Sequence, residues 1–501
     1  MNNSRQKVVI AGGGTAGWIV AAFLSKLLKN AVDVHLIEST SIPTIGVGEA
    51  TVNQIRVFNQ LLGIDEASFM REVHATFKYG IEFVNWGQQG NRYIHSFGLA
   101  GKGSWACQFQ HFWLAAKRLG ITHDYGEYCL EHEAAKAGRF YTSEKSKINY
   151  GYHLDASLYA NFLKNIAIEQ GVNHIQATID DVILAPDNGY IQNIKLDNGN
   201  TIDGDLFIDC TGLAAKLTKG ALHTGFESFS HLLPCDSAVA VQTTNNDNFP
   251  PYTQSIAHNF GWQWKIPLQH RTGNGLVYCS HYVSDELARD TLLQNLSGEP
   301  ISDIRAFRYE TGRRTTPWHK NCVAIGLSSG FLEPLESTSI HLILTATLRL
   351  IKLFPHSELC QSNIDEYNQQ TNQEIDSIRD FLVMHYHLND RTDSPFWRHC
   401  RTMNIPDSLQ HKLNLFKNTG NVVCSTQDLF QNDSWVQVML SQGVTPESYH
   451  PILDTMPESE LREFLTGFRS FIQQAVSSMP DHQAFIEQYC KQPSNNLQGH
   501  S

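Results

Sequence analysis

The hydrophobic pattern at the start of the chain predicts a βαβ unit. An apolar run from Lys7 to Ala11 is followed at once by the glycine-rich stretch GGGTAGW, residues 12–18. Amphipathic spacing then predicts a helix from Thr15 to Lys29, and a second apolar run predicts a strand from Val32 to Ile37. A strand, a glycine turn, a helix and a second strand are typical of the first part of a dinucleotide-binding fold.

The pattern changes along the chain from strands to helices. Apolar alternation broken by Gly, Asn and Asp predicts strands at 173–184, 190–196 and 201–209. From about residue 340 onward the pattern is helical, beginning with a helix from Ile340 to Phe354. Residues 458–476 carry apolar side chains at i, i+3, i+4 and i+7, which are Leu461, Phe464, Leu465, Phe468, Phe471 and Ile472. We therefore expect an α/β (α+β) protein with an added, mainly helical C-terminal region.

The glycine spacing has a steric reason. Gly12, Gly14 and Gly17 form G-x-G-x-x-G, which permits a tight turn, lets the backbone approach a pyrophosphate and lets the helix pack on the strand. The helix N-terminus then faces the phosphates. Glu38 closes the second strand roughly 20 residues after Gly17, where a carboxylate accepts hydrogen bonds from a ribose hydroxyl. The acid argues against NADP but leaves both NAD and FAD open.

A second segment favours FAD. Asp209-Cys210-Thr211-Gly212 follows the apolar strand Leu206-Phe207-Ile208 and resembles a second contact segment of large FAD modules. We expect a Rossmann-like FAD-binding module over residues 1–345, with inserted substrate-site segments at about 70–150. A mainly helical region that covers the substrate is expected over 346–490, and a disordered tail over 491–501.

Composition narrows the partners. The 501 residues include 38 basic and 50 acidic side chains, a net charge of −12, which gives no basic footprint for nucleic acid or an anionic membrane. No apolar run reaches the roughly 18 residues of a membrane span. The 10 cysteines are scattered without a CxxC pair, which favours buried thiols in a reducing compartment. We expect a cytoplasmic protein that acts on a small molecule.

Four further motifs occur in one order along the chain: GVGEAT at 46–51, FKYGI at 77–81, GWQWKIP at 261–267 and EPLEST at 333–338. Together they resemble the flavin-dependent halogenases of the tryptophan halogenase type, over residue 7 to about residue 450, and WxWxIP is the specific signature. The resemblance implies an enzyme that uses reduced FAD, O2 and chloride or bromide to make hypohalous acid. It also implies a separate flavin reductase that supplies the reduced FAD, and a homodimer is one option.

The resemblance assigns the chemistry to two residues. Lys78 is the lysine that receives hypohalous acid through an internal tunnel, and Glu336 is its acidic partner. Burial would lower the pKa of Lys78 and so allow a neutral amine or a directed proton. Taken alone, a lysine on a strand is more often a solvated face residue, and only the resemblance reverses this for Lys78. Glu336 is also consistent with the first-turn acid of the helix that follows.

The other family positions concern the flavin, the halide and the tunnel. The flavin contacts implied by resemblance are Gly12, Gly14, Thr15, Ala16, Gly17, Glu38, Ser39, Val47, Ala50, Leu327 and Ile340. Backbone N–H groups of Thr338 and Ser339, at a helix start, suit a halide, although a plain N-cap is the alternative and the family usually has glycine in place of Ser339. Trp262 and Trp264 are two residues apart and share a strand face, as tunnel walls or as core aromatics.

Substrate positions resemble the family only in part. His95 and Phe97 match its His-x-Phe pocket motif, and Trp435 aligns with a stacking tryptophan of the tryptophan-specific enzymes. Where those enzymes have an acid, a phenylalanine and an asparagine, this chain has Phe430, Ser434 and Met439. Phe430 cannot pair with an ammonium group. We expect an indole, a phenol, or a larger or carrier-borne aromatic, rather than free tryptophan.

Two histidines raise the question of a metal. His385 and His387 are separated by one residue, and no third ligand lies nearby in the sequence. Polar residues at a helix end are therefore the preferred interpretation, and we expect no metal site.

Two other functions are left open by the residues. A single-component flavin hydroxylase shares the FAD fold, but it must take hydride from a nicotinamide, and no second motif for that is present. An FAD-binding protein without chemistry is disfavoured by the intact Lys78, Glu336 and WxWxIP.

Overall fold

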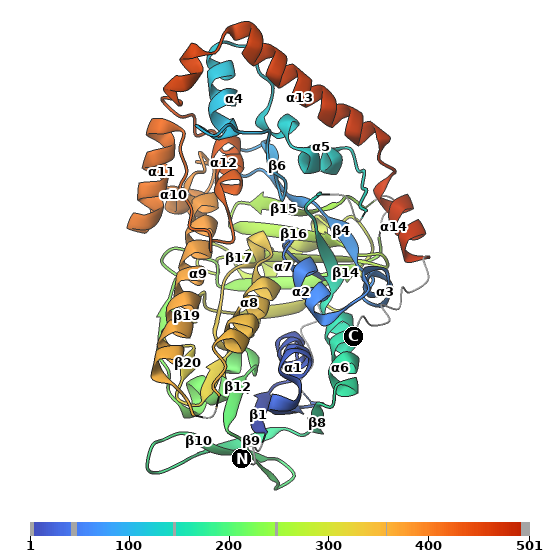
Figure 1. Ribbon diagram of the computed structural model, residues 1–501, viewed down its shortest axis with the longest axis vertical. Helices are drawn as coiled ribbons and strands as arrows, with labels where there is room; N and C mark the ends of the chain where they lie inside the picture. The colour runs from blue at the N-terminus through green and yellow to red at the C-terminus, as the bar shows by residue number, and fades with distance from the viewer. Residues whose placement is uncertain (1–4, 42–47, 144–146, 246–248, 357, 492–501) are drawn as a thin grey trace.

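The computed structural model describes residues 5–41, 48–143, 147–245, 249–356 and 358–491. Figure 1 shows an elongated molecule in which a lower sheet contains the first strand, a larger sheet lies in the middle and helices gather at the top. The α/β class and the helical C-terminal region predicted from the sequence are confirmed.

The lower sheet is built on the predicted βαβ unit. Its order is β20-β21-β12-β1-β2-β8, and the neighbours from β21 to β8 are parallel. The strands are β1 (Gln6–Ala11), β2 (Val32–Glu38), β8 (Asn173–Gln176), β12 (Leu206–Asp209), β20 (Trp318–His319) and β21 (Cys322–Ala324). Helices α1 (Thr15–Leu28), α6 (Ala156–Glu169) and α8 (Ser339–Lys352) cover one face, where Val8 and Ile10 point.

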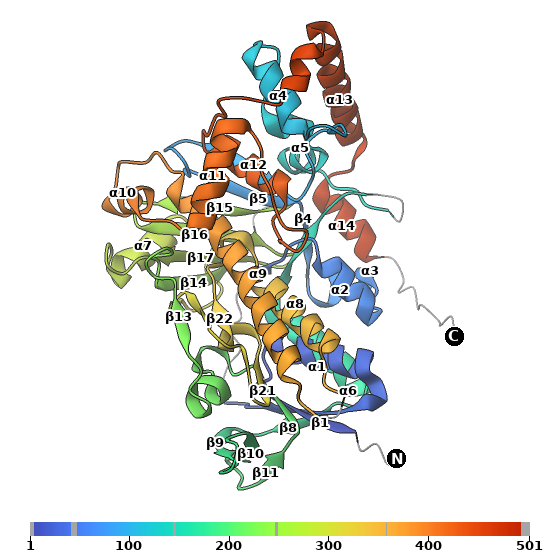
Figure 2. The same ribbon diagram turned by 60° about the vertical axis from the view of Figure 1, so that its left-hand side comes forward.

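A three-stranded meander covers the opposite face of this sheet, against Val9 and Phe207. It consists of β9 (Ile179–Leu184), β10 (Ile191–Leu196) and β11 (Thr201–Asp203), at the lower tip in Figures 1 and 2. The expected strands at 173–184 and 201–209 are therefore each divided between two sheets. At the second division, Asp205 accepts a 2.7 Å hydrogen bond from the Lys7 backbone N–H and turns the chain into β12.

The central sheet has the order β18-β14-β17-β16-β15-β5-β6. Its strands are β5 (Gly80–Val84), β6 (Arg92–Ser96), β14 (Ser237–Thr243), β15 (Tyr252–His258), β16 (Gly261–Pro267), β17 (Thr272–Tyr278) and β18 (Arg305–Arg308). Only the β5–β15 pair within it is parallel. A further small sheet pairs β13 (Phe226–Ser228), β19 (Gly312–Arg314) and β22 (Gly330–Phe331).

A three-stranded sheet places Lys78. It pairs β3 (Gly48–Ala50), β7 (Gly151–Asp155) and β4 (Thr76–Lys78). Only Tyr79 separates β4 from β5 of the central sheet, and its backbone N–H donates a 2.7 Å hydrogen bond to the Pro251 carbonyl. Lys78 therefore lies where the chain passes from one sheet to the next, inside the protein.

From α8 onward, the described part of the chain contains helices and no β-strand. These helices are α9 (Gln361–His387), α10 (Pro395–Thr402), α11 (Asp407–Thr419), α12 (Asn432–Ser441), α13 (Glu458–Ser478) and α14 (His482–Cys490). The helices of the first part not yet named are α2 (Ile55–Leu62), α3 (Glu66–Glu72), α4 (Phe109–Arg118), α5 (Leu130–Lys136) and α7 (Asp285–Gln294). The long α9 runs from the lower sheet up to the helical top (Figure 1).

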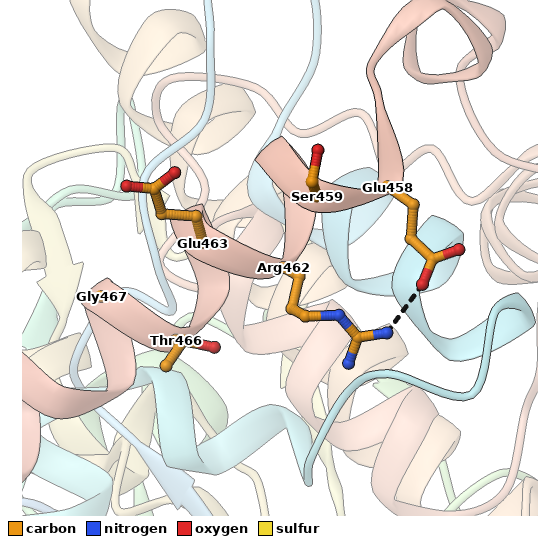
Figure 3. Close-up of a pocket in the computed structure, with 6 residues that line it drawn as sticks. All are labelled: Glu458, Ser459, Arg462, Glu463, Thr466 and Gly467. Atoms are coloured by element: carbon orange, nitrogen blue, oxygen red, sulfur yellow. Dashed lines mark hydrogen bonds and ion pairs between the residues drawn. The ribbon is translucent and has the colours of Figure 1, made fainter.

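The predicted amphipathic helix is α13, with one correction. Leu461, Leu465 and Ile472 are buried as expected, but Phe471 is 65% exposed. Successive helix residues are about 100° apart, so Phe471 lies to one side of the buried Ile472. The buried stripe of α13 is therefore narrower than the apolar pattern of the sequence suggested. On the exposed face Arg462 pairs with Glu458 at 2.7 Å, beside a surface hollow formed by α13 alone (Figure 3).

Other expectations have mixed outcomes. Seven of the ten free cysteines are buried, whereas Cys360 is exposed and Cys424 and Cys490 are half-buried. None of the described helices is long and apolar enough to cross a membrane. The expected tail at 491–501 lies outside the described residues except for Lys491.

The corrected face of α13 gives a prediction. Leu465→Ala should lower the free energy of unfolding by about 2–5 kcal/mol, because it leaves a cavity beneath the helix. Phe471→Ala, a comparable truncation on the same helix, should change it by about 0.5 kcal/mol or less. Urea denaturation measures both, and an equal loss in the two variants would contradict the observed helix face.

Candidate active site

The glycine turn forms a cradle at the start of α1. Gly12 has φ +110°, and a Cβ there would lie 2.3 Å from the Cys210 carbonyl oxygen. A Cβ on Gly17 would lie 1.9 Å from the Gly12 carbonyl oxygen, so the helix packs on the turn only through glycine. By contrast, a Cβ on Gly14 would meet nothing within 4 Å, and α1 begins there without a side-chain cap. The open space at this helix N-terminus fits a dinucleotide pyrophosphate.

The expected ribose-binding acid is fixed beside this turn. A Cβ on Gly13 would come within 2.4 Å of the Glu38 side chain. Lys164 Nζ donates to Glu38 Oε2 at 2.9 Å, and Trp18 Nε1 donates to Oε1 at 3.3 Å. Burial by itself raises the pKa of the Glu38 carboxyl, but these two donors, together with His174 at 2.8 Å from Oε2, outweigh it and bring the pKa below its usual value. Glu38 is therefore an ionised acceptor in the position the sequence predicts.

The other expected flavin contacts lie around the same cradle. A Cβ on Gly326 would lie 2.8 Å from the Ala16 Cβ, so the segment with Leu327 packs against the start of α1. The remaining positions are Thr15, whose hydroxyl donates to the Ala156 carbonyl, Ser39, which bonds to Thr178, and the buried Ala50 and Ile340. Val47 lies outside the described residues. The part played by each of these residues in binding FAD stays a prediction.

Lys78 is fully buried, which excludes the solvated-face alternative. Its Nζ donates to Ser337 Oγ at 2.8 Å and to the Thr51 carbonyl at 3.2 Å, and it lies 5.1 Å from the centre of the Phe97 ring. Burial lowers the pKa of Lys78 from its ordinary 10.5 to about 7, against the attraction of Glu336. Three of the motifs found in the sequence therefore meet at one amine that can gain or lose a proton near neutral pH.

Glu336 lies between two imidazoles. His95 Nδ1 is 2.9 Å from its Oε2, and His385 Nε2 is 2.9 Å from its Oε1. Burial raises the pKa of Glu336, but His95 and His385 outweigh it and bring it to about 2. Glu336 acts on Lys78 through its charge, while the hydrogen-bonded partners of Lys78 are Ser337 and Thr51.

His385 lies at a helix end, as interpreted from the sequence, but it also contacts Glu336, which that interpretation did not foresee. His385 is fully buried in the last turn of α9, and only its neighbour His387 is half-buried. Local spacing could not indicate this contact, because His385 and Glu336 come from separate segments. Among the described residues, no group of three or more His, Cys, Asp or Glu side chains is arranged to hold a metal ion.

Ser337 is a site residue that the sequence reasoning missed. It has φ 60°, a left-handed conformation that glycine adopts at lower cost, and this turn directs its hydroxyl toward Lys78. The only signal for it is its place between Glu336 and Thr338 in the EPLEST motif.

Thr338 and Ser339 lie at the start of α8 as predicted. Thr338 makes no side-chain cap bond, and its buried Oγ1 has no hydrogen-bond partner within the described residues. A plain side-chain N-cap is therefore not what the structure shows. The first N–H groups of a helix lack intrahelical partners, so this end fits a small anion.

Trp262 and Trp264 share one face of β16, with ring centres 6.1 Å apart. Both are buried, and Trp262 Nε1 donates to Glu333 Oε2 at 3.1 Å. The shared face confirms the strand prediction. Their role as tunnel walls stays a prediction.

The substrate side is lined by aromatic rings. Phe430 stacks on Phe381 with centres 3.9 Å apart, and Phe381 lies 5.4 Å from the His95 ring. Trp435 is only 1% exposed, with its indole N–H donated to the Phe430 carbonyl, whereas Phe97 is half-buried. Phe97 is therefore the more accessible aromatic ring beside Lys78, and Phe381 is a neighbour of His95 that the sequence reasoning missed.

A dinucleotide cradle at the carboxyl end of a parallel sheet places the protein among those with a Rossmann-like dinucleotide-binding module, and a buried lysine lies outside that sheet. Comparison with known proteins narrows this class. The family model described as tryptophan halogenase matches residues 7–458, so the chain belongs to the tryptophan halogenase family. It is a flavin-dependent halogenase, and it uses FAD and a halide.

Individual relatives agree over nearly their whole length. The tryptophan 6-halogenase ThaL of Streptomyces albogriseolus is 34% identical, covering 92% of this chain and 93% of ThaL. Among solved structures, Xcc4156, a flavin-dependent halogenase from Xanthomonas campestris, is 47% identical with a TM-score of 0.96, covering 98% of this chain and 99% of that one. BrvH, a flavin-dependent halogenase from Brevundimonas sp. BAL3, is 39% identical with a TM-score of 0.93, covering 97% and 100%.

The strained serine gives a prediction. Ser337→Ala removes the hydroxyl and keeps the backbone strain, whereas Ser337→Gly removes both. The glycine variant should be more stable than the alanine variant by about 1 kcal/mol in chemical denaturation. Both should lose the same large part of halogenation activity, because both leave the Lys78 amine without its hydroxyl acceptor. Native activity in either variant would contradict the assigned contact.

Proposed function

We propose that this halogenase modifies a neutral, electron-rich aromatic molecule of the indole or phenol type, with Lys78 as the residue that presents the halogenating agent. The observation that carries this proposal is the buried Lys78 amine, whose pKa of about 7 allows both protonation states near neutrality. FAD, reduced by a separate flavin reductase, supplies hypohalous acid from O2 and chloride or bromide when it is bound.

Lys78 and Glu336 divide the work at the ring. Lys78 either carries the halogen as a haloamine or holds intact hypohalous acid through a hydrogen bond. Phe97 lies next to it, and an aromatic ring can stack on Phe97. The ring carbon gains halogen and must lose its proton. Glu336 is ionised and buried a short way from Lys78, so it is the base that takes this proton, with His95 and His385 stabilising its charge. In either route the hypohalous oxygen leaves as water, because its second proton comes from the Lys78 amine, and Glu336 then returns the ring proton to that amine.

The halide is expected at the N-terminus of α8, beside Thr338 and Ser339. The positive end of this 14-residue helix attracts an anion, and the buried, unbonded Thr338 hydroxyl adds a donor. Serine in place of the usual glycine keeps the backbone N–H group. The segment Glu336–Ser339 therefore joins the halide position directly to the Lys78 contact.

The lining argues against an amino-acid substrate. Phe430 packs face to face on Phe381, where the tryptophan-specific enzymes are expected to carry an acid for the ammonium group. Lys412 Nζ lies 4.1 Å above the Trp435 ring, and its positive charge further opposes an ammonium group here. A neutral aromatic avoids the cost of burying an unpaired ammonium.

The first experiment tests the reaction and the lysine together. Purified protein, FAD, a flavin reductase, NADH and a panel of indoles and phenols are incubated with chloride or bromide, and products are identified by mass spectrometry. We expect halogenated product from the native protein and none from Lys78→Ala. Lys265→Ala is the matched control, because Lys265 lies in GWQWKIP but bonds to Ser297. Hydroxylated product, or equal halogenation by Lys78→Ala, would contradict the proposal.

The second experiment tests the substrate class. The ratio kcat/KM for indole should exceed that for L-tryptophan by at least about tenfold, the factor that corresponds to roughly 1.4 kcal/mol of unpaired-charge cost. 3-Methylindole, which lacks the zwitterion but keeps a substituent, should behave like indole. A preference for L-tryptophan would show that an anchor for the amino acid exists.

A further inference from the structure

Both carboxyl groups of the EPLE sequence are held by consecutive residues at the end of α9. His385 contacts Glu336, as described, and the next residue, Tyr386, donates its hydroxyl to Glu333 Oε2. The same oxygen accepts the indole N–H of Trp262 at 3.1 Å. Glu333 thus joins α9 to β16 through Trp262. The indole N–H of Trp264, the other tryptophan of the WxWxIP motif, has no partner among the described residues.

The contact is buried on all sides. Glu333 has no solvent exposure, and Trp262 and Tyr386 are buried with it. Its second oxygen, Oε1, has no hydrogen-bond partner within the described part of the chain. The indole N–H of Trp262 is therefore satisfied by a single acceptor. Losing that acceptor would leave a buried donor unpaired, so the contact favours one orientation of the indole.

The geometry also connects Trp262 to the lysine. Glu333 begins the short segment that ends in Glu336 and Ser337, and Ser337 bonds directly to Lys78. A single rigid turn therefore fixes Lys78 at one end and the Trp262 indole at the other. We propose that Glu333 is a positioning residue that sets the orientation of Trp262 and so directs hypohalous acid to Lys78 instead of to solvent. This rests on the proposed function and on the prediction from the sequence that Trp262 walls the passage to Lys78.

Three variants and one combination test the coupling. Glu333→Ala removes the acceptor, Glu333→Gln keeps an amide oxygen that can accept the indole N–H, and Trp262→Phe removes the donor. The measured quantity is halogenated product formed per NADH consumed, with released hypohalous acid trapped by a 1,3-diketone. We expect product per NADH to fall about fivefold in Glu333→Ala, with a matching rise in trapped hypohalous acid. Glu333→Gln should stay close to native.

The double variant separates positioning from general damage. Because Glu333 is proposed to direct hypohalous acid through its contact with Trp262, Glu333→Ala combined with Trp262→Phe should direct it no worse than the more affected single variant. Multiplied losses in the double variant, or equal losses in Glu333→Gln and Glu333→Ala, would overturn the proposal. Thermal unfolding of each variant identifies any that is misfolded, and Glu333→Gln provides a folded comparison.

A readout without turnover separates this inference from the proposed function. The protein has 9 tryptophans, and labelling them with 15N gives one indole N–H resonance for each, of which Trp262→Phe identifies the one from Trp262. We expect this resonance to move upfield in Glu333→Ala and to stay near its native position in Glu333→Gln. An unchanged resonance in Glu333→Ala would overturn the positioning role even if the native enzyme halogenates. A shifted resonance in a protein that forms no halogenated product would instead refute the proposed function alone.

Discussion

The hydrogen bond from Lys78 Nζ to Ser337 Oγ is the contact on which the site depends. Lys78 ends β4, next to the central sheet, and Ser337 lies in the turn that enters α8. The bond therefore joins β4 to the start of α8. A buried amine loses its hydration, and the pKa of Lys78 falls to about 7 as a result. The Thr51 carbonyl supplies the second acceptor, from the segment that follows β3.

The six residues from Glu333 to Thr338 contain two glutamates whose carboxyl groups have very different pKa values. Glu336 faces two imidazoles and its pKa falls to about 2, whereas Glu333 faces only the neutral donors of Trp262 and Tyr386 and burial raises its pKa to about 7. The same residue type three positions apart is therefore ionised in one place and readily protonated in the other. The turn therefore keeps a carboxylate ionised at Glu336 and leaves Glu333 able to exist in either protonation state near neutral pH.

The parts of the structure that could be predicted are those set by residues close together in the sequence. The glycine cradle, its helix and Glu38 follow from the βαβ pattern, and burial of Trp262 and Trp264 on one face follows from their spacing. Lys78 and Glu336 needed the family resemblance, because nothing local distinguishes a buried lysine from a solvated one. Ser337, His385 and Phe381 were missed since their contacts join distant segments; Lys78 and Ser337 are 259 positions apart. Phe471 was misplaced because periodicity does not give the width of a buried stripe.

The account requires that the Lys78 amine titrates near neutrality inside the folded protein. NMR with lysine labelled at 13Cε measures this directly when the protein is titrated from pH 5 to 11, with Lys78→Met identifying the Lys78 resonance. We expect an inflection at about pH 7, because burial lowers the pKa of Lys78 more than the charge of Glu336 raises it. An inflection near the ordinary lysine value of 10.5 would contradict it, because Lys78 would then be a solvated ammonium and could not present the halogenating agent as proposed.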